Sequence, residues 1–286
     1  KNSVLTVALI LGAATTTMAQ DKQYTPEADD WAIGIDATPF LSYFGNFIGG
    51  NDGNTAPSWN FLTNNQTITG KYFTSADMAY RGSLRLGFGS NSANSMVGQD
   101  GAAAPTYPNL PTMVEDTWKQ GNTNIGLSGG LEWRKGNGRL QGFYGGELGI
   151  MFSSTSTTYT YGNAMTTTGA TSTDFGTGNL NGDPVYGNGR LLSQSGGGTF
   201  GLGIRGFIGA EYFVLPKLSI GGEFGWGIAF MSTGAMTETW ESTDGSAIGT
   251  IEHTGTKSSA FGIDTESNNG VFGTAGSIRM TFHFQE

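Results

Sequence analysis

The chain has 286 residues, of which 13% are charged and 12% aromatic, and it contains 48 glycines. This composition is typical of β-strands and polar loops rather than of a helical enzyme. A net charge of −9 without a basic cluster argues against a nucleic-acid partner, and the lack of cysteine excludes disulfides and thiol chemistry.

The first 19 residues are expected to form a signal peptide. Lys1 precedes an apolar run over residues 4–14 that is too short to span a bilayer as a helix, and small residues follow up to Ala19. We expect cleavage after Ala19, which makes Gln20 the first residue of the mature chain and residues 20–30 a periplasmic N-terminal segment. Downstream, no stretch approaches the roughly 20 apolar residues of a membrane helix. A secreted β-sandwich and an outer-membrane β-barrel remain.

Eight segments are expected to be β-strands, because apolar and polar residues alternate along them with a period of two. In chain order they are residues 31–43, 66–73, 79–89, 123–134, 140–152, 200–214, 218–230 and 271–284. The segment 66–73 alternates weakly, and it is assigned because an eighth strand is needed between its two neighbours.

The connections between these segments alternate between short and long. Short turns follow Phe73, Arg134 and Val214, whereas the long polar connections are residues 46–64, 90–122, 162–197 and 233–269. This asymmetry is typical of periplasmic turns and extracellular loops. The sequence therefore predicts an all-β fold over residues 31–286, a transmembrane antiparallel up-and-down β-barrel of eight strands in the outer membrane.

Aromatic residues gather near both ends of the predicted strands, as at the two interfaces of a bilayer. Near the short turns are Trp31, Tyr72, Tyr80, Trp133 and Tyr212, and near the long connections are Tyr43, Phe88, Phe152 and Phe230. The general preference of aromatic residues for strands is the alternative explanation.

The polar faces of the strands carry ten charged residues, which we expect to point into the lumen. They are Asp36, Glu132, Glu147, Glu211 and Glu223 together with Arg81, Arg85, Arg134, Arg205 and Arg279. Paired arginines and carboxylates offset the cost of burying charge, and no lysine is expected among them. Because an eight-stranded barrel is about wide enough for side chains to fill, we predict a plugged, charge-paired lumen. A narrow ion path is the alternative.

Glycines on the same inward faces are expected to make room for the arginine side chains. They are Gly34, Gly203, Gly209, Gly221 and Gly225.

The signal ending at Ala19-Gln20, the alternating strands and the inward Glu/Arg set resemble the OmpA/OmpX-like outer-membrane β-barrel superfamily, especially its forms in Bacteroidota. The resemblance covers essentially all of the mature chain and rests on periodicities rather than signature motifs. It implies a surface, adhesive, structural or small-pore role, in contact with outer-membrane lipid and lipopolysaccharide. An extracellular ligand or a neighbouring complex subunit would bind through loops 162–197 and 233–269.

Enzymatic sites are weakly supported, because histidine is scarce. His253 lies in the last long connection beside Glu252, where a solvated loop histidine is the simpler interpretation, and His283 lies on the inward face of the last strand. No His pair has metal-ligand spacing, and nothing selects one serine for a Ser–His site. We expect no catalytic residues, metal or cofactor. A structural or surface-interaction role ranks first, a porin-like small-solute or ion channel second, and an outer-membrane enzyme third.

Overall fold

The computed structural model of the chain describes residues 24–50, 68–168, 172–175, 177–178, 188–264 and 276–284. The predicted signal peptide and parts of the predicted long loops lie outside these ranges. The described part is built almost entirely of antiparallel β-strands, with one helix, α2 (Thr38–Gly49). Within it, no helix combines the length and the hydropathy needed to cross a membrane.

Eight strands pair edge to edge and form a closed ring. In order around the ring they are β1 (Trp31–Asp36), β2 (Ile68–Ser75), β3 (Met78–Gly98), β4 (Met113–Asn137), β5 (Leu140–Thr160), β8 (Thr199–Leu215), β9 (Leu218–Thr233) and β13 (Gly276–Phe284). The pairing of β13 with β1 closes the ring. Each of the eight predicted strands corresponds to a ring strand, including the weak segment 66–73, which is β2.

Short turns join β2 to β3, β4 to β5 and β8 to β9 at one end of the ring, as predicted. The β4–β5 turn consists of Gly138 and Arg139, and Gly138 has a φ of 70°, which glycine adopts without the strain that a side chain adds. At the other end the two sides of the ring differ. On one side β1, β2 and β13 are short, whereas β3, β4 and β5 on the other side continue far beyond the rim.

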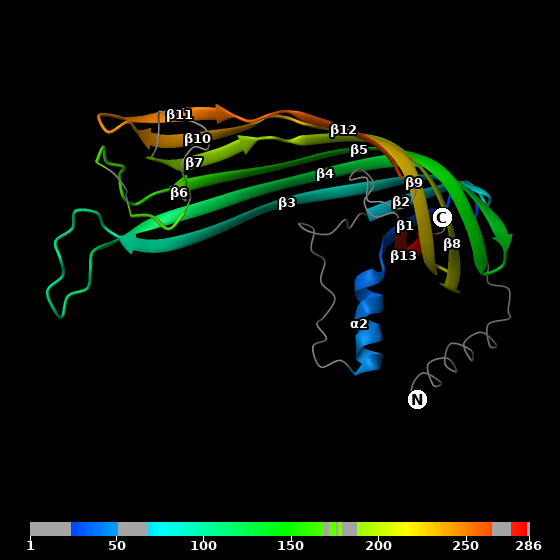
Figure 1. The fold of residues 1–286 in the computed structure, drawn as a ribbon. Helices are drawn as coiled ribbons and strands as arrows, with labels where there is room; N and C mark the ends of the chain where they lie inside the picture. The colour runs from blue at the N-terminus through cyan, green and yellow to red at the C-terminus, as the bar shows by residue number, and fades with distance from the viewer. Residues whose placement is uncertain are drawn as a thin grey trace.

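The long strands build a curved sheet beyond the rim, called the extension below (Figure 1). Its strands are the distal parts of β3, β4 and β5, then β7 (Asn188–Gly196), β10 (Met236–Thr243) and β11 (Ile248–Thr254), in that order across the sheet. The short β6 (Thr177–Gly178) pairs with β7, and β12 (Ser258–Asp264) pairs with the distal half of β9. Much of the described part of the predicted loops 90–122, 162–197 and 233–269 is therefore strand, which corrects the prediction.

The extension continues the ring through bends in adjacent strands. β7 passes into β8 at Gly196 and Gly197, which have φ of 80° and 62°, and β9 passes into β10 at Gly234. The backbone N–H of Gly197 donates to the carbonyl of Ala235 (2.9 Å), and that of Gly234 donates to the carbonyl of Gly198 (2.9 Å). Since the bends bond to one another, ring and extension form one continuous sheet.

The first predicted strand is wrong in its second half. β1 ends at Asp36, and residues 38–49 form α2, with proline in its first turn and Gly50 as a left-handed C-cap. Proline favours the start of a helix, and Phe40, Phe44 and Phe47 recur at helical spacing. Tyr43 therefore lies on a helix at the rim and not in a ring strand, so it cannot occupy the predicted strand position.

The two faces of the ring strands separate as predicted. Inward positions are mostly buried, and outward positions carry exposed apolar side chains, such as Leu148 and Ile204, which are 52% and 62% exposed. At the short-turn end, the interior is packed with the apolar side chains of Ala32, Phe73, Ala79 and Phe213. This small apolar layer lies next to the charged residues described below.

Candidate functional site

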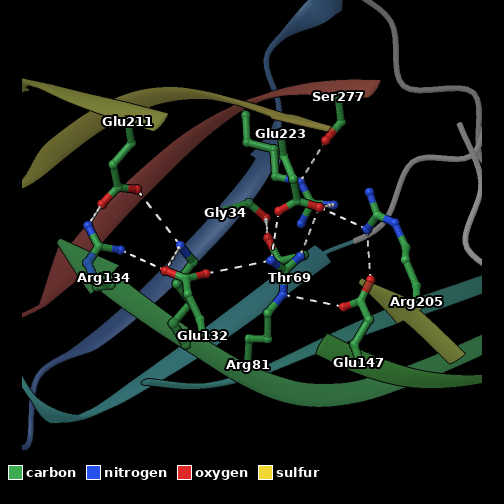
Figure 2. Close-up of polar contacts among 12 residues, drawn as sticks. Gly34, Thr69, Arg81, Glu132, Arg134, Glu147, Arg205, Glu211, Glu223 and Ser277 are labelled. Atoms are coloured by element: carbon green, nitrogen blue, oxygen red, sulfur yellow. Dashed lines mark hydrogen bonds and ion pairs between the residues drawn. The ribbon is translucent and has the colours of Figure 1, made fainter. Parts of the chain in front are cut away.

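Charged side chains from seven ring strands meet inside the ring and form what we call the charge cluster (Figure 2). Its members are Lys71 on β2, Arg81 on β3, Glu132 and Arg134 on β4, Glu147 on β5, Arg205 and Glu211 on β8, Glu223 on β9 and Arg279 on β13. All are buried except Arg279, whose side chain is 21% exposed. Strict alternation along each strand places these side chains in the interior.

Glu132 is the centre of the half that lies nearer the short turns. Its Oε1 accepts hydrogen bonds from Lys71 Nζ (2.8 Å) and from Arg134 Nη1 (2.8 Å), and its side chain is fully buried. Arg134 also donates through Nη2 to Glu211, and Lys71 Nζ lies 3.8 Å from Glu211 Oε2. Two cations and two carboxylates thus form a closed circuit.

Arg81 and Arg205 hold the other half together. Arg81 Nη1 donates to Glu223 Oε2 (2.7 Å) and Arg81 Nε lies 3.3 Å from Glu147 Oε2. Arg205 Nη1 lies 2.8 Å from both Glu147 Oε1 and Glu223 Oε1. Arg81 Nη1 is also 3.6 Å from Glu132 Oε2, so it joins the two halves.

Aromatic rings cover the cations from the inside. The Arg81 guanidinium lies 4.0 Å from the centre of the Phe207 ring, and Lys71 Nζ lies 4.8 Å from that of Phe143. The negative face of an aromatic ring attracts a cation, and the attraction is larger away from water. These inward phenylalanines stabilise the cluster, and they interrupt the polar faces that the sequence predicts.

Most of the predicted lumen residues come together. The structure joins Arg81, Glu132, Arg134, Glu147, Arg205, Glu211, Glu223 and Arg279. Asp36 and Arg85 face the same interior, where they are half-buried and not fully buried like most members of the cluster.

Lys71 is the cluster residue that the sequence analysis missed, and the expectation that no lysine joins the arginines was wrong. It occupies an inward position of β2, two residues before the buried Phe73. The position of Lys71 on the inward side of the predicted strand 66–73 could have indicated its place in the cluster. The weak alternation of that strand, however, does not show clearly which of its side chains point inward.

Inward glycines create the space for these large side chains. An added Cβ at Gly225 would overlap the Arg205 guanidinium, as predicted for the inward glycines. At Gly209 and Gly145 an added Cβ would instead overlap the rings of Phe143 and Phe207. The prediction is therefore right for Gly225. It is wrong for Gly209, which makes room for an aromatic ring, and for Gly34 and Gly221, where an added Cβ would meet Thr69 and Glu211.

The chemistry of the cluster is that of a structural core. Its five cations face four carboxylates, and most of its side chains have at least two oppositely charged neighbours. Buried ion pairs recover their desolvation cost only when the geometry is good and further hydrogen bonds are made. The Arg–Glu pairs meet this condition and tie the walls of the ring together.

One serine and one histidine lie together at the edge of the cluster. Ser219 Oγ is 3.1 Å from His283 Nε2 and 3.4 Å from Glu211 Oε2. A hydrolytic triad needs the carboxylate on the histidine, to orient it, and a serine that substrate can reach. Here the Glu211 carboxylate contacts the serine and not the histidine, and Ser219 is fully buried. The arrangement therefore does not meet either requirement of a triad.

His253 lies far from this interior, on β11 of the extension. Its side chain is exposed, and its Nδ1 is 4.0 Å from Glu238 Oε2. Within the described ranges, no three His, Cys, Asp or Glu residues come together in a way that could hold a metal ion.

The end of the extension is held by a second polar cluster around Asp116 of β4. Its carboxylate accepts hydrogen bonds from the Gly162 N–H (2.9 Å), the Thr173 hydroxyl (2.6 Å) and the Asp174 N–H (3.2 Å). Nearby, Arg190 of β7 bonds to Glu241 of β10.

Tyr161 lies beside Arg190, whose guanidinium is 4.3 Å from the centre of the tyrosine ring. Burial raises the pKa of the Tyr161 hydroxyl, which donates to the carbonyl of Leu191 (2.5 Å). The described part of the predicted loop 162–197 is thus fixed by specific contacts.

No protein-family model matches this sequence, and no curated protein matches it either.

Proposed function

We propose that this protein is a non-enzymatic outer-membrane β-barrel, with a plugged and charge-paired lumen, that presents the extension outside the cell as a structural or surface-interaction element. The expected resemblance to the OmpA/OmpX-like superfamily, with its eight strands, belongs to this proposal. Export by a signal peptide belongs to it as well.

The observation that carries the proposal is a belt of exposed apolar side chains around the ring. Its members are Ile33, Leu84, Leu86, Phe88, Leu127, Leu148, Ile150, Phe152, Phe200, Leu202, Ile204, Ile208, Phe224, Trp226, Ile228, Phe230, Ile278 and Phe282. Soluble monomers rarely expose a continuous apolar surface of this extent, whereas a transmembrane barrel requires one.

The belt ends at one level on neighbouring strands, as the edge of a bilayer demands. On β5 the outward residues are apolar up to Phe152 and then change to Ser154, Ser156 and Thr158. Phe152 is paired with Ile125 of β4, and from Thr123 to Glu115, toward the extension, the outward residues of β4 are also polar or small. The apolar part of β5, residues 140–152, is long enough for a tilted membrane strand, which needs about 9–11 residues.

Aromatic residues at the short-turn end support the same placement. The ring of Trp31 lies 4.8 Å from that of Tyr72, and the ring of Trp133 lies 5.9 Å from that of Tyr144. Such rings are enriched where a bilayer meets water. Short turns are periplasmic in bacterial barrels and long segments are extracellular, so the extension would project from the cell surface.

The charge cluster supports a plugged lumen rather than a pore. Ion pairs such as Arg81–Glu223 cross the interior, and the cluster rests on the apolar layer of Phe73 and Phe213. In planar bilayers we expect the refolded protein to show no steady conductance. Steady single-channel steps that change with Arg81→Ala or Glu147→Ala would instead establish the channel.

Membrane insertion is tested by charged substitutions on one strand. Leu148→Arg places a charge within the belt, where a lipid-facing arginine costs about 2–4 kcal/mol near the bilayer midplane. Ser156→Arg is the matched control, on the same face of β5 but beyond the belt. Folding into lipid vesicles, followed by heat-modifiable gel mobility, should fail or weaken only for Leu148→Arg. Equal folding of both variants would contradict the proposal.

A further inference from the structure

A cavity lies where the ring passes into the extension, on the face that continues the interior of the ring. Its volume is about 430 Å³, within the range of about 300–1,000 Å³ that small-molecule sites occupy. It is lined by β4, β5 and the bend between β7 and β8, with Gly196, Gly197 and Met236 on one side. The lining chain segments are thus strands of one continuous sheet and a bend that is fixed by hydrogen bonds.

The polar lining consists of amides and hydroxyls. Side chains that line the cavity include Gln120, Asn122, Asn124, Ser153, Thr157 and Gln194. None of the described residues that line the cavity carries a charge. An amide offers both donors and an acceptor, and a hydroxyl can donate or accept, so this lining matches a neutral ligand rich in hydroxyl groups.

Two of the amides are oriented by bonds that use only part of their capacity. Asn122 Oδ1 accepts a hydrogen bond from Thr155 Oγ1 (3.0 Å), and Gln194 Nε2 donates to Glu238 Oε1 (2.7 Å). Each bond engages one polar atom of a group that can form several. These hydrogen bonds hold the two amide side chains in place before a ligand binds, which lowers the entropic cost of binding.

Aromatic rings follow directly along the same face. Trp118 lies two residues before Gln120 on β4 and Tyr159 two residues after Thr157 on β5, and the two are paired across the strands. Both are half-buried, and the ring of Tyr159 stacks on that of Tyr161 with an angle of 5°. The flat, weakly polar C–H face of a sugar ring packs well against such a surface.

We infer that this cavity binds a neutral carbohydrate, with the amides taking the hydroxyl groups and Trp118 and Tyr159 extending the site along the chain of sugars. The inference rests on the proposed surface role, for which it names the ligand class. An acidic glycan is disfavoured, because none of the described residues that line the cavity carries a positive charge to pair with the glycan's acidic group.

The test uses the folded full chain and an immobilised panel of oligosaccharides. The neutral probes are built from glucose, galactose, mannose and N-acetylglucosamine, and the acidic probes are sialylated or sulfated. We expect saturable binding of at least one neutral probe, which titration calorimetry then quantifies. Binding should quench or shift tryptophan fluorescence, and Trp118→Phe should remove most of that signal.

Variants locate the binding. Asn122→Ala combined with Asn124→Ala should raise the Kd on the order of tenfold or more, since each lost hydrogen bond weakens binding several-fold. Ser153→Phe, which fills the cavity from β5, should abolish binding independently. Lys119→Ala combined with Thr158→Ala, on the opposite face of the same two strands, is the control and should bind as the unchanged protein does.

Three results overturn the inference: no neutral probe binds, only acidic probes bind, or the cavity variants bind as well as the control. The heat-modifiable mobility of each variant verifies that it has folded. The binding assay is carried out on protein folded in detergent, so it does not depend on insertion into vesicles. Loss of binding by a protein that inserts normally therefore contradicts only this inference. Failure of the protein to insert contradicts the proposed function and leaves the binding result intact.

Discussion

Arg81 and Glu223 form an ion pair across the full width of the ring, with 2.7 Å between Arg81 Nη1 and Glu223 Oε2. Their strands, β3 and β9, are separated by three strands in either direction around the ring. Lys71 and Glu211 approach in the same way from β2 and β8. Contacts of this kind connect opposite walls directly, so the stability of the ring depends on its interior as well as on its strand pairing.

The first prediction concerns Glu132, whose carboxylate bonds to Lys71 and Arg134. Glu132→Ala should lower the free energy of unfolding by about 3–5 kcal/mol, because it leaves buried cations uncompensated. Unfolding by urea in lipid vesicles, monitored by fluorescence, measures the loss. Glu115→Ala removes an exposed carboxylate from the same strand and should change stability by less than about 0.5 kcal/mol.

A second substitution tests whether the charge or the contact matters at this position. Combining Glu132→Leu with Lys71→Met removes both members of one pair and should recover part of the stability lost in Glu132→Ala. The single variants Glu132→Leu and Lys71→Met are measured alongside it. If the double variant loses as much free energy of unfolding as the two single variants together, Lys71 and Glu132 do not stabilise the ring as a pair.

The second prediction concerns Gly225, which leaves room for the Arg205 guanidinium. Gly225→Val should cost at least about 2 kcal/mol, because the added side chain displaces Arg205 from Glu147 and Glu223. Gly222→Val, on the outward face of the same strand with open space around it, should stay near the stability of the unchanged protein. Equal losses for the two valines would contradict the displacement.

The third prediction concerns Ser219, which is buried against His283 and Glu211. Ser219→Ala should lower the free energy of unfolding by about 1–3 kcal/mol, because the buried His283 Nε2 and Glu211 Oε2 each lose a hydrogen-bond partner. A fluorophosphonate probe with mass spectrometry should find Ser219 unlabelled in the folded protein. Labelling of Ser219, or hydrolysis of an ester substrate that Ser219→Ala abolishes, would favour an enzyme.

The fourth prediction concerns Asp116 at the end of the extension. Asp116→Ala removes the acceptor for Gly162, Thr173 and Asp174, so the tip should become sensitive to proteases while the ring remains protected. Limited proteolysis with mass spectrometry locates the cuts. Glu115→Ala is the matched control, and cuts that appear equally in both variants would contradict a local role for Asp116.

Alternation predicted the ring well because its two faces meet opposite surroundings. Along β5, Leu148 and Ile150 are exposed outside while Glu147 is buried inside, so residue type follows direction over residues 147–150. Most of the charge cluster could be predicted for the same reason. The pairing partners could not, since which arginine meets which carboxylate depends on the register around the ring.

The extension escaped prediction because both of its faces are polar. Residues 90–98 of β3 and 236–243 of β10 show no apolar side with a period of two, although both segments form strands. Without an apolar face, the polar composition of these two segments is typical of a loop. The helix α2 was missed because the alternation of β1 was extended across Thr38 and Pro39, where a helix-start signal is present.

The seam between β1 and β13 also has a consequence for the order in which the molecule is assembled. It pairs Trp31 with Phe284 and Asp36 with Arg279, so the two strands that close the ring come from opposite ends of the described chain. Contacts so distant in sequence form slowly, because the intervening segment must first be brought together. Until then the cations and carboxylates of the interior can stay hydrated. Closure of a single seam would therefore desolvate them together, as a late and concerted event.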